Sequence, residues 1–326
     1  MMPEKLVEVV NLSKSYQSAK KGLFRKSRIP VLRNVDLQIA PGEILGLVGE
    51  SGSGKSTLGK AVLKLIDADE GDIVFDGQNL GGLTTSQLRA RRKDMQIIFQ
   101  DPYASLDPRK TVRAALSEAL ETHGLYTGDA QEPRLEALMK MVGLSAEFLG
   151  RLPHEFSGGQ RQRIGIARAL AVEPRFIVAD EAVSALDVSI QAQVLNLLAD
   201  LRRDTGVAML FISHDLSVVR FISDRVMVLY LGRVMEVGPA NDVHFAPAHP
   251  YTAALVSAEP SLKPKGERIG LKGEIPSPMN PPSGCVFRSR CPFAIGACDE
   301  KIPELRLIGQ GRYKACIRDD ILKGAE

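Results

Sequence analysis

The segment GESGSGKST, residues 49–57, combines glycines, a lysine and a serine at the spacing of a phosphate-binding loop. Gly49, Gly52 and Gly54 allow a tight turn in which consecutive backbone amides point at one phosphate group. An apolar run precedes the segment and a helical pattern follows it, so a helix N-terminus adds partial positive charge. We expect Lys55 to reach the β- and γ-phosphates of a nucleotide and the Ser56 hydroxyl to bind Mg²⁺. A glycine-rich turn without a ligand is the alternative interpretation, and the complete motif in this context argues against it.

A pair of carboxylates ends a second apolar run, in RFIVADEA at residues 175–182. A buried strand that delivers acidic side chains at its carboxyl end places them where α/β folds bind ligands. We expect Asp180 to hold the Mg²⁺ shell and Glu181 to act as general base on an attacking water. An apolar run followed by two acids is common by itself, and its weight here comes from the phosphate loop upstream.

A third motif, FSGGQRQRIGIARAL at residues 156–170, opens a helix with a serine and two glycines. A helix that begins in this way is a second N-terminus suited to an anion. The chain has one phosphate loop and therefore one nucleotide site of its own. We expect the second helix N-terminus of each copy to contact the nucleotide bound by a neighbouring copy. An ordinary capped helix is the alternative, because Ser157 is a favourable N-cap.

These motifs require strands and helices that hold them in place. Continuous apolar runs occur at residues 44–48, 95–99, 176–180, 208–213 and 226–230, and helical patterns at 55–66, 160–172 and 189–204. This alternation predicts an α/β fold with a parallel sheet covered on both faces. Only helical periodicity remains between residues 106 and 152, which predicts a helical insert. Prolines and glycines are frequent in residues 260–283, which predicts a linker before a small C-terminal module.

Bulk composition limits the class of protein. The chain has 326 residues, of which 44% are hydrophobic and 25% charged, as in globular proteins. A net charge of +3 gives no electrostatic argument for binding nucleic acid. The N-terminus shows no secretion signal and no window is apolar enough to span a bilayer, so we expect a cytoplasmic location with reduced thiols.

With these motifs in order, the chain resembles the ATP-binding subunit of an ABC transporter. The resemblance implies a P-loop NTPase cassette with a parallel sheet core, an antiparallel β subdomain and a helical insert, and it implies ATPase activity. It implies that Lys55, Gln100, Glu181 and His214 are catalytic, Gln100 from IIFQDP and His214 from FISHD. It also implies a set of ATP-binding residues: Tyr16, Gly49, Glu50, Ser51, Gly52, Ser53, Gly54, Lys55, Ser56, Thr57, Gln100, Asp180, Glu181 and His214. The Mg²⁺ ligands it implies are Ser56, Gln100 and Asp180.

The same resemblance assigns two segments to a dimer interface. The signature motif facing the partner's ATP would be Phe156, Ser157, Gly158, Gly159 and Gln160, and the D-loop would be Ser184, Ala185, Leu186 and Asp187. Two residues depart from the family pattern. The family usually has leucine where this chain has Phe156 and proline where it has Ala182. Proline fixes φ, so Ala182 raises the question of whether the turn that aims Glu181 is loosened and hydrolysis impaired.

The C-terminal part resembles a narrower group. HPYT at 249–252 and GEIPSPMNPPSGCVFRSRCP at 273–292 are similar to ATPases of bacterial dipeptide, oligopeptide and nickel importers. The basic segment 17–30 is similar to the F-type member of a two-ATPase pair. We therefore expect a cassette over residues 1–259, with its helical insert at about 101–155, and a Cys-bearing module over 260–326.

The importer resemblance implies a set of partners and a location. The partners would be two transmembrane permease subunits, a paralogous ATPase and, indirectly, a periplasmic or extracellular substrate-binding protein, with no nucleic acid. The F-type features favour a heterodimer of ATPases, and a homodimer is the alternative. The chain would lie peripherally on the cytoplasmic face of the bacterial inner membrane. A soluble regulatory ABC ATPase with a metal-sensing tail is the alternative function.

The cysteines fall in the last 42 residues, as Cys285, Cys291, Cys298 and Cys316. A reducing compartment disfavours disulfides, and the short C-x₂₋₄-C spacing typical of zinc sites is absent. Four thiolates can hold a [4Fe–4S] cluster, and resembling importer ATPases carry one in this tail. Zinc and unligated thiols remain alternatives. A metal group would supply folding energy to a module with little core of its own.

Overall fold

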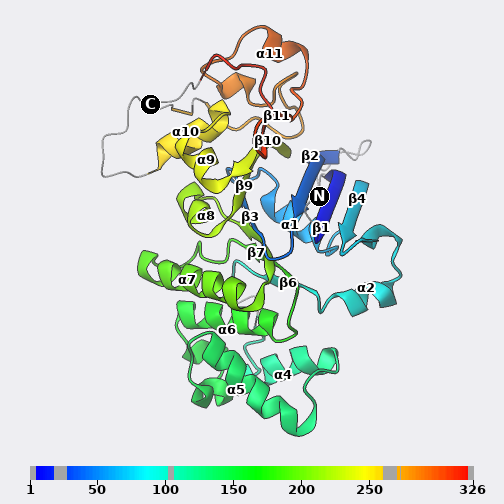
Figure 1. Cartoon of the computed structure of the whole chain (residues 1–326), viewed down its shortest axis with the longest axis vertical. Helices are drawn as coiled ribbons and strands as arrows, with labels where there is room; N and C mark the ends of the chain where they lie inside the picture. The colour runs from blue at the N-terminus through cyan, green and yellow to red at the C-terminus, as the bar shows by residue number, and fades with distance from the viewer. Residues whose placement is uncertain (1–4, 18–27, 102–105, 260–269, 272, 322–326) are drawn as a thin grey trace, which may run out of the picture. The chain divides into compact units, whose positions relative to one another are not determined.

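The computed structural model describes residues 5–17, 28–101, 106–259, 270–271 and 273–321 (Figure 1). The chain divides into two compact units. The first consists mainly of Phe75–Ile212 with Ile39–Glu43, and the second of Val7–Gln38, Ile44–Val74 and Ser213–Glu326. Part of the basic segment 17–30 and part of the predicted linker lie outside the described residues.

The first unit contains a set of parallel strands in the spatial order β8, β7, β6. Their bounds are β6 Met95–Ile98, β7 Phe176–Asp180 and β8 Ala208–Ile212. Phe176 pairs with Met95 on one side and with Ala208 on the other. Every residue of β7 and β8 is buried, which explains their continuous apolar sequences. The predicted parallel strands are confirmed, and the carboxyl end of β7 carries Asp180.

Helices make up most of the remainder of the first unit, and α4, α5 and α6 gather beside one another (Figure 1). Side chains cap two of these helices: Thr111 accepts a hydrogen bond from the Ala114 N–H at the start of α4, and Ser157 caps α6. Helix α7 ends at Gly206, whose φ of 69° suits a left-handed C-cap. The elements are β5 Gln78–Asn79, η1 Leu80–Gly82, α2 Thr85–Arg91, α4 Val112–Thr122, η2 Gly128–Ala130, α5 Gln131–Met141, η3 Ala146–Gly150, η4 Pro153–Glu155, α6 Gly158–Leu170 and α7 Val188–Thr205.

The second unit contains strands of two sheets. One runs in the order β2 (Arg28–Ile39), β1 (Val7–Gln17), β4 (Glu70–Phe75). The other runs β11, β12, β10, β9, β3, with β3 Ile44–Val48, β9 Arg225–Tyr230, β10 Arg233–Pro239, β11 Arg306–Gly309 and β12 Arg312–Lys314. Strand β3 is parallel to β9, and the pairs β9–β10, β10–β12 and β12–β11 are antiparallel. The hairpin β11–β12 therefore adds C-terminal residues to the sheet of the cassette.

A buried carboxylate fixes that hairpin. Glu236 of β10 is fully buried and accepts hydrogen bonds from the backbone N–H groups of Ala248 and His249, both at 2.9 Å. Arg312 of β12 donates from Nη2 to the same carboxylate at 2.8 Å. Because a buried charge is tolerated only when it is paired and hydrogen-bonded, Arg312 makes docking of the hairpin part of the fold of this unit.

Short helices complete the second unit: α1 Lys55–Val62, α8 Leu216–Ile222, α9 Ala240–Phe245, α10 Pro250–Ala258, η5 Arg288–Arg290 and α11 Ala297–Glu300. Among the described helices of both units, none combines the length and the apolar character needed to cross a membrane.

Candidate functional site

The phosphate loop connects β3 to α1 in the second unit. Gly49 has φ of 156°, and a Cβ there would lie 2.1 Å from the Leu229 carbonyl oxygen. Gly54 has φ of 108° and is the N-cap of α1, which begins at Lys55. The Lys55 ammonium is buried and donates to the carbonyl oxygens of Gly49 at 2.7 Å and Glu50 at 3.1 Å. The loop thus has the backbone shape that its glycines predict, with its lysine folded back along it.

Other loop residues differ in exposure. Ser51 and Gly52 are exposed, whereas Ser53 is buried and its hydroxyl finds no hydrogen-bond partner among the described residues. The Ser53 carbonyl accepts a hydrogen bond from the N–H of Gly232 at 2.9 Å, which anchors the loop to the β9–β10 turn. Ser56 and Thr57, in the first turn of α1, are half-buried.

The two carboxylates lie at the carboxyl end of β7 in the first unit. Asp180 is buried, and Glu181 follows it with φ of 47°, a left-handed conformation that non-glycine residues adopt only when the surroundings impose it. The Glu181 N–H donates to Ile212 of β8 at 3.0 Å. Gln100 donates from Nε2 to Glu181 Oε2 at 2.8 Å. This unit therefore brings together the predicted general base and the predicted glutamine.

The turn after Glu181 is closed by Ser184. Its N–H and its hydroxyl both donate to the Glu181 carbonyl oxygen, at 3.1 and 2.9 Å. Ala182 is buried inside this turn. The predicted D-loop, Ser184 to Asp187, leads directly into α7, whose N-cap is Asp187.

The signature segment begins α6 in the first unit. Ser157 and Gln160 form a capping box: the Ser157 N–H donates to Gln160 Oε1 at 3.0 Å, and the Gln160 N–H donates to Ser157 Oγ at 3.3 Å. A Cβ on Gly159 would lie 2.4 Å from Ile190 Cγ2, so glycine is required where α6 meets α7. Phe156 is buried edge-to-face against Phe148, which explains why an aromatic residue is accommodated where the family has leucine.

Tyr16 and His214 belong to the second unit. Tyr16, at the end of β1, is 41% exposed, with the Lys14 ammonium 5.6 Å from its ring centre. His214 is exposed and follows β8 by two residues. Of the predicted Mg²⁺ ligands, Ser56 falls in the second unit and Gln100 and Asp180 in the first. The roles of these residues toward ATP and Mg²⁺ remain predictions.

All four cysteines are free thiols in the second unit. The Cys285 N–H donates to the Cys298 carbonyl oxygen at 2.8 Å. Burial raises the pKa of Cys285 and Cys316, and it raises the pKa of Cys291 to about 11, with the neighbouring thiolates adding to each increase. No group of three or more His, Cys, Asp or Glu side chains that could hold a metal ion is found among the described residues.

Sequence reasoning missed the residues that hold the phosphate loop at Glu50. The Glu50 N–H donates to the Tyr251 hydroxyl at 2.9 Å, and the Glu50 carboxylate pairs with Arg290 at 2.6 and 3.1 Å. Tyr251 lies in the HPYT segment and Arg290 between two cysteines, so both belong to motifs already noted. Tyr251 and Arg290 follow Glu50 by 201 and 240 residues in the sequence, so no local spacing indicates that they contact the loop.

Comparisons with known proteins agree with these motifs. A family model described as ABC transporter matches residues 32–184, and one described as the C-terminal region of oligopeptide/dipeptide transporters matches residues 235–298. A protein of Brucella ovis described as a peptide import ATP-binding protein is 54% identical over 318 residues, covering 97% of this chain and 98% of the relative. The oligopeptide transport ATP-binding protein AppF of Bacillus subtilis is 50% identical, covering 93% of this chain and 94% of the relative.

Solved structures give the same result for the cassette. The dimeric bacterial ABC transporter cassette MJ0796 matches with a TM-score of 0.64 and 30% identity, over 72% of this chain and 98% of that chain. A post-hydrolysis state of that cassette bound to ADP and Pi matches with a TM-score of 0.63 and 32% identity, over the same shares of the two chains. With its fold, its motifs and relatives matched over nearly their full length, the chain belongs to the ABC transporter family of ATP-binding proteins and carries the C-terminal region of the oligopeptide/dipeptide transporters.

Proposed function

We propose that this chain binds and hydrolyses ATP and so powers a membrane transporter that imports di- or oligopeptides. The observation that carries the proposal is the hydrogen bond from Gln100 to Glu181 at the end of a buried strand, one residue after Asp180. This arrangement suits a carboxylate that accepts a proton from an attacking water while an amide orients it. The peptide cargo rests on the relatives, which are named for peptide and oligopeptide import.

In the proposed reaction, water attacks the γ-phosphate of ATP in line with the leaving oxygen. The amides of the phosphate loop and Lys55 bind the β- and γ-phosphates, and Glu181 accepts the proton of the attacking water. Mg²⁺, held by Ser56, Gln100 and Asp180, would neutralise phosphate charge. The amides at Ser157–Gly159 of a second subunit would face the same ATP, so binding of ATP favours closure of the pair through its contacts with both faces.

A groove in the first unit is where we place the permease. It has a volume of about 360 Å³ and is lined by β6 residues Gln96 and Ile97, by Phe99 and by α4 residues Ala115 and Ala119, among others. Gln100 adjoins it in sequence, so a segment seated there would lie next to the residue that contacts Glu181. The groove therefore offers a physical link between hydrolysis and a membrane partner.

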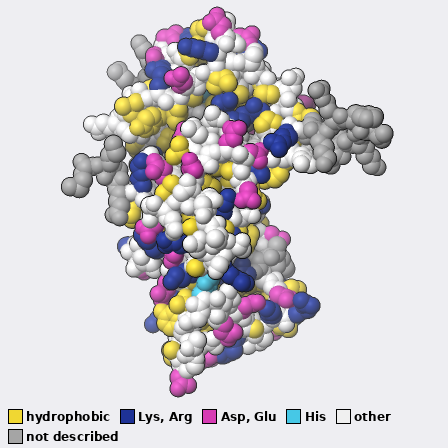
Figure 2. Space-filling model, turned by 90° about the vertical axis from the view of Figure 1, so that its right-hand side faces the viewer, with side chains coloured by type: hydrophobic (Ala, Val, Ile, Leu, Met, Phe, Trp, Pro, Cys, Tyr) yellow, Lys and Arg dark blue, Asp and Glu magenta, His cyan; other side chains and the backbone are white. Residues whose placement is uncertain are grey.

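The proposed assembly comprises two permease subunits, this chain and a paralogous ATPase, on the cytoplasmic face of the membrane, with an external binding protein that delivers the peptide. On the described part of the face in Figure 2, Lys and Arg side chains are interspersed with Asp and Glu, which offers little to a nucleic acid. The alternative of a regulatory ATPase with a metal-sensing tail is not favoured, because the relatives are named for import.

Affinity purification of the tagged chain from detergent-solubilised membranes tests this assembly. We expect two permease subunits and a second ATPase to be retained at comparable amounts, identified by mass spectrometry. A chain that hydrolyses ATP but retains no permease would support the regulatory alternative instead.

We also propose that Cys285, Cys291, Cys298 and Cys316 hold a [4Fe–4S] cluster. The support is the resemblance to importer ATPases that carry such a cluster, together with four cysteines that are all free thiols. Because the described residues contain no group of three or more side chains arranged to hold a metal ion, binding of the cluster would have to draw the four thiols together. When bound, the cluster would cross-link the module and add to its folding energy. Anaerobic purification should give a brown protein with about four irons per chain. A colourless protein with one zinc per chain would overturn the proposal.

A further inference from the structure

The C-terminal module contacts the phosphate loop directly, at Glu50. We propose that Arg290 and Tyr251 are positioning residues of the nucleotide site, which hold the phosphate loop in its binding shape and neutralise the charge of Glu50. The proposal rests on the proposed binding of ATP to this loop. All the residues involved lie in the second unit.

Tyr251 holds the loop through its backbone. The Glu50 N–H donates to the Tyr251 hydroxyl at 2.9 Å, and the Tyr251 side chain is completely buried. Its ring packs against Tyr230 at 4.7 Å and Phe287 at 5.3 Å between ring centres, and both of those residues are also buried. A rigid aromatic cluster therefore fixes the first peptide group after Gly49.

Arg290 holds the side chain of the same residue. Its Nη1 and Nη2 atoms donate to the two Glu50 carboxylate oxygens at 2.6 and 3.1 Å, and the Arg290 side chain is only 6% exposed. Nη1 also lies 3.4 Å from the Tyr230 hydroxyl. A bidentate pair of this kind is directional and is strengthened by the low local dielectric.

The charge of Glu50 explains why the loop needs this pair. Glu50 carries a negative charge in a loop whose proposed ligand is a phosphate chain. The carboxylate and the phosphates would repel each other within one loop. Arg290 removes that repulsion by pairing with the carboxylate. Lys55 also donates to the Glu50 carbonyl oxygen, so movement of Glu50 would displace the lysine that reaches the phosphates.

The position of Arg290 depends on the C-terminal module. It ends the short helix η5, and its N–H donates to the carbonyl oxygen of the buried Phe287 at 3.0 Å. A change in the module that displaces η5 is therefore expected to move Arg290 and, through its ion pair with Glu50, the phosphate loop.

The test is a double-mutant cycle on the full chain, with affinity for Mg²⁺-ATP measured by calorimetry and KM and kcat measured for ATP hydrolysis. Arg290→Met should raise Kd and KM at least about tenfold while kcat changes less than about threefold, because the loop binds substrate and transition state alike. Arg290→Lys should recover part of the loss. In a Glu50→Gln background, Arg290→Met should change KM less than about twofold, because no charge is left to neutralise.

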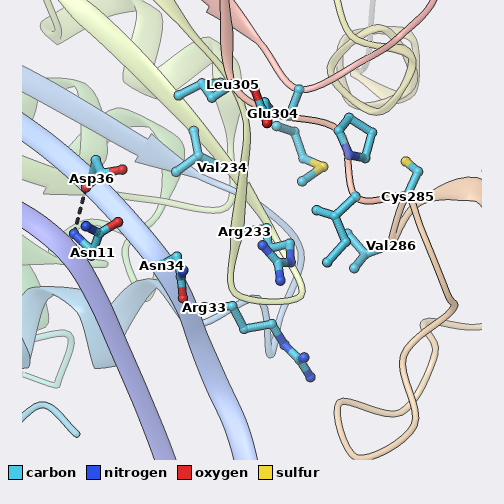
Figure 3. A pocket seen from close by; sticks show the side chains of 14 residues that line it. Asn11, Arg33, Asn34, Asp36, Arg233, Val234, Cys285, Val286, Glu304 and Leu305 are labelled. Atoms are coloured by element: carbon cyan, nitrogen blue, oxygen red, sulfur yellow. Dashed lines mark hydrogen bonds between the residues drawn. The ribbon is translucent and has the colours of Figure 1, made fainter. Parts of the chain in front are cut away.

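Arg33→Met is the matched control, because Arg33 also joins the cassette to the C-terminal residues but does not contact the loop. Its Nη2 donates to the Pro278 carbonyl oxygen at 2.7 Å. Figure 3 shows it near Arg233 in a cavity of about 410 Å³ that Cys285 and Val286 also line. This variant should lower thermal stability without changing KM.

These measurements distinguish ATP binding by the chain from the action of Arg290 through Glu50. If the wild-type chain binds no ATP, the proposed function fails. If the wild type binds ATP and Arg290→Met leaves Kd and KM unchanged, or if the effect is the same in the Glu50→Gln background, Arg290 does not act through Glu50 and the inference is overturned.

Discussion

At the scale of single residues, Glu181 is held by more constraints than a surface carboxylate needs. Its φ of 47° is maintained by its own N–H bond to β8 and by the two donors of Ser184 on its carbonyl group. Residues in such conformations cost about 1–3 kcal/mol each and persist where the surroundings impose them. In this backbone conformation the Glu181 carboxylate accepts a hydrogen bond from Gln100 Nε2 at 2.8 Å.

Glu181→Gln should abolish turnover and spare binding. The amide cannot accept a proton but has nearly the same shape, so we expect kcat to fall by about 10²–10⁴-fold. The affinity for ATP should stay within a few fold of wild type. Phosphate release and calorimetric titration on the same preparation measure the two effects, and Lys55→Met serves as the contrasting variant that loses binding. Hydrolysis at the wild-type rate would remove Glu181 from the mechanism.

At the scale of elements, the segment that begins α10 connects three parts of the second unit. His249 is the N-cap of α10, accepting the Tyr251 N–H on Nδ1 at 3.0 Å, while its own N–H donates to Glu236 of β10. Tyr251 in turn contacts the phosphate loop through Glu50. The C-terminal region is thus attached to the cassette by buried polar bonds as well as by the β11–β12 hairpin.

The buried imidazole makes stability depend on pH. Burial, assisted by the Lys314 cation, lowers the pKa of His249 to about 3, whereas an unfolded histidine has a pKa near 6.5. Between these values the unfolded state binds the extra proton, so the contribution to stability is complete above pH 6.5 and declines as the pH falls. When the pH falls from 6.5 to 5, the free energy of unfolding of the wild type should decrease by about 2 kcal/mol more than that of His249→Gln. Urea unfolding at both pH values measures this difference, and equal losses in the two proteins would contradict it.

The groove beside α4 gives a prediction about how the ATPase associates with the permease. Ala119 is half-buried in its lining, so Ala119→Arg should fill the groove with a long charged side chain. We expect the variant to bind and hydrolyse ATP at close to wild-type rates but to lose association with the permease subunits during affinity purification. Ser86→Arg, outside the lining of this groove, is the control. Retention of the permease by Ala119→Arg would place the docking surface elsewhere.

At the scale of the whole molecule, sequence predicts the local parts better than their long-range connections. The runs ILGLV and FIVAD became buried strands β3 and β7, because a continuous apolar run has no solvated face to present. The glycines of the phosphate loop likewise dictate its backbone. Pairing of β12 with β10, and of Arg290 with Glu50, joins residues more than 70 positions apart, and no local spacing encodes such contacts.

Uptake of a radiolabelled oligopeptide by cells that carry Glu181→Gln in the chromosomal copy tests whether ATP hydrolysis by this chain drives peptide import. We expect ATP-dependent uptake with the wild-type chain and loss of that uptake with the variant, at equal protein levels in the membrane fraction. Undiminished uptake of di- and oligopeptides by the Glu181→Gln cells, with the purified variant inactive as an ATPase, would contradict it.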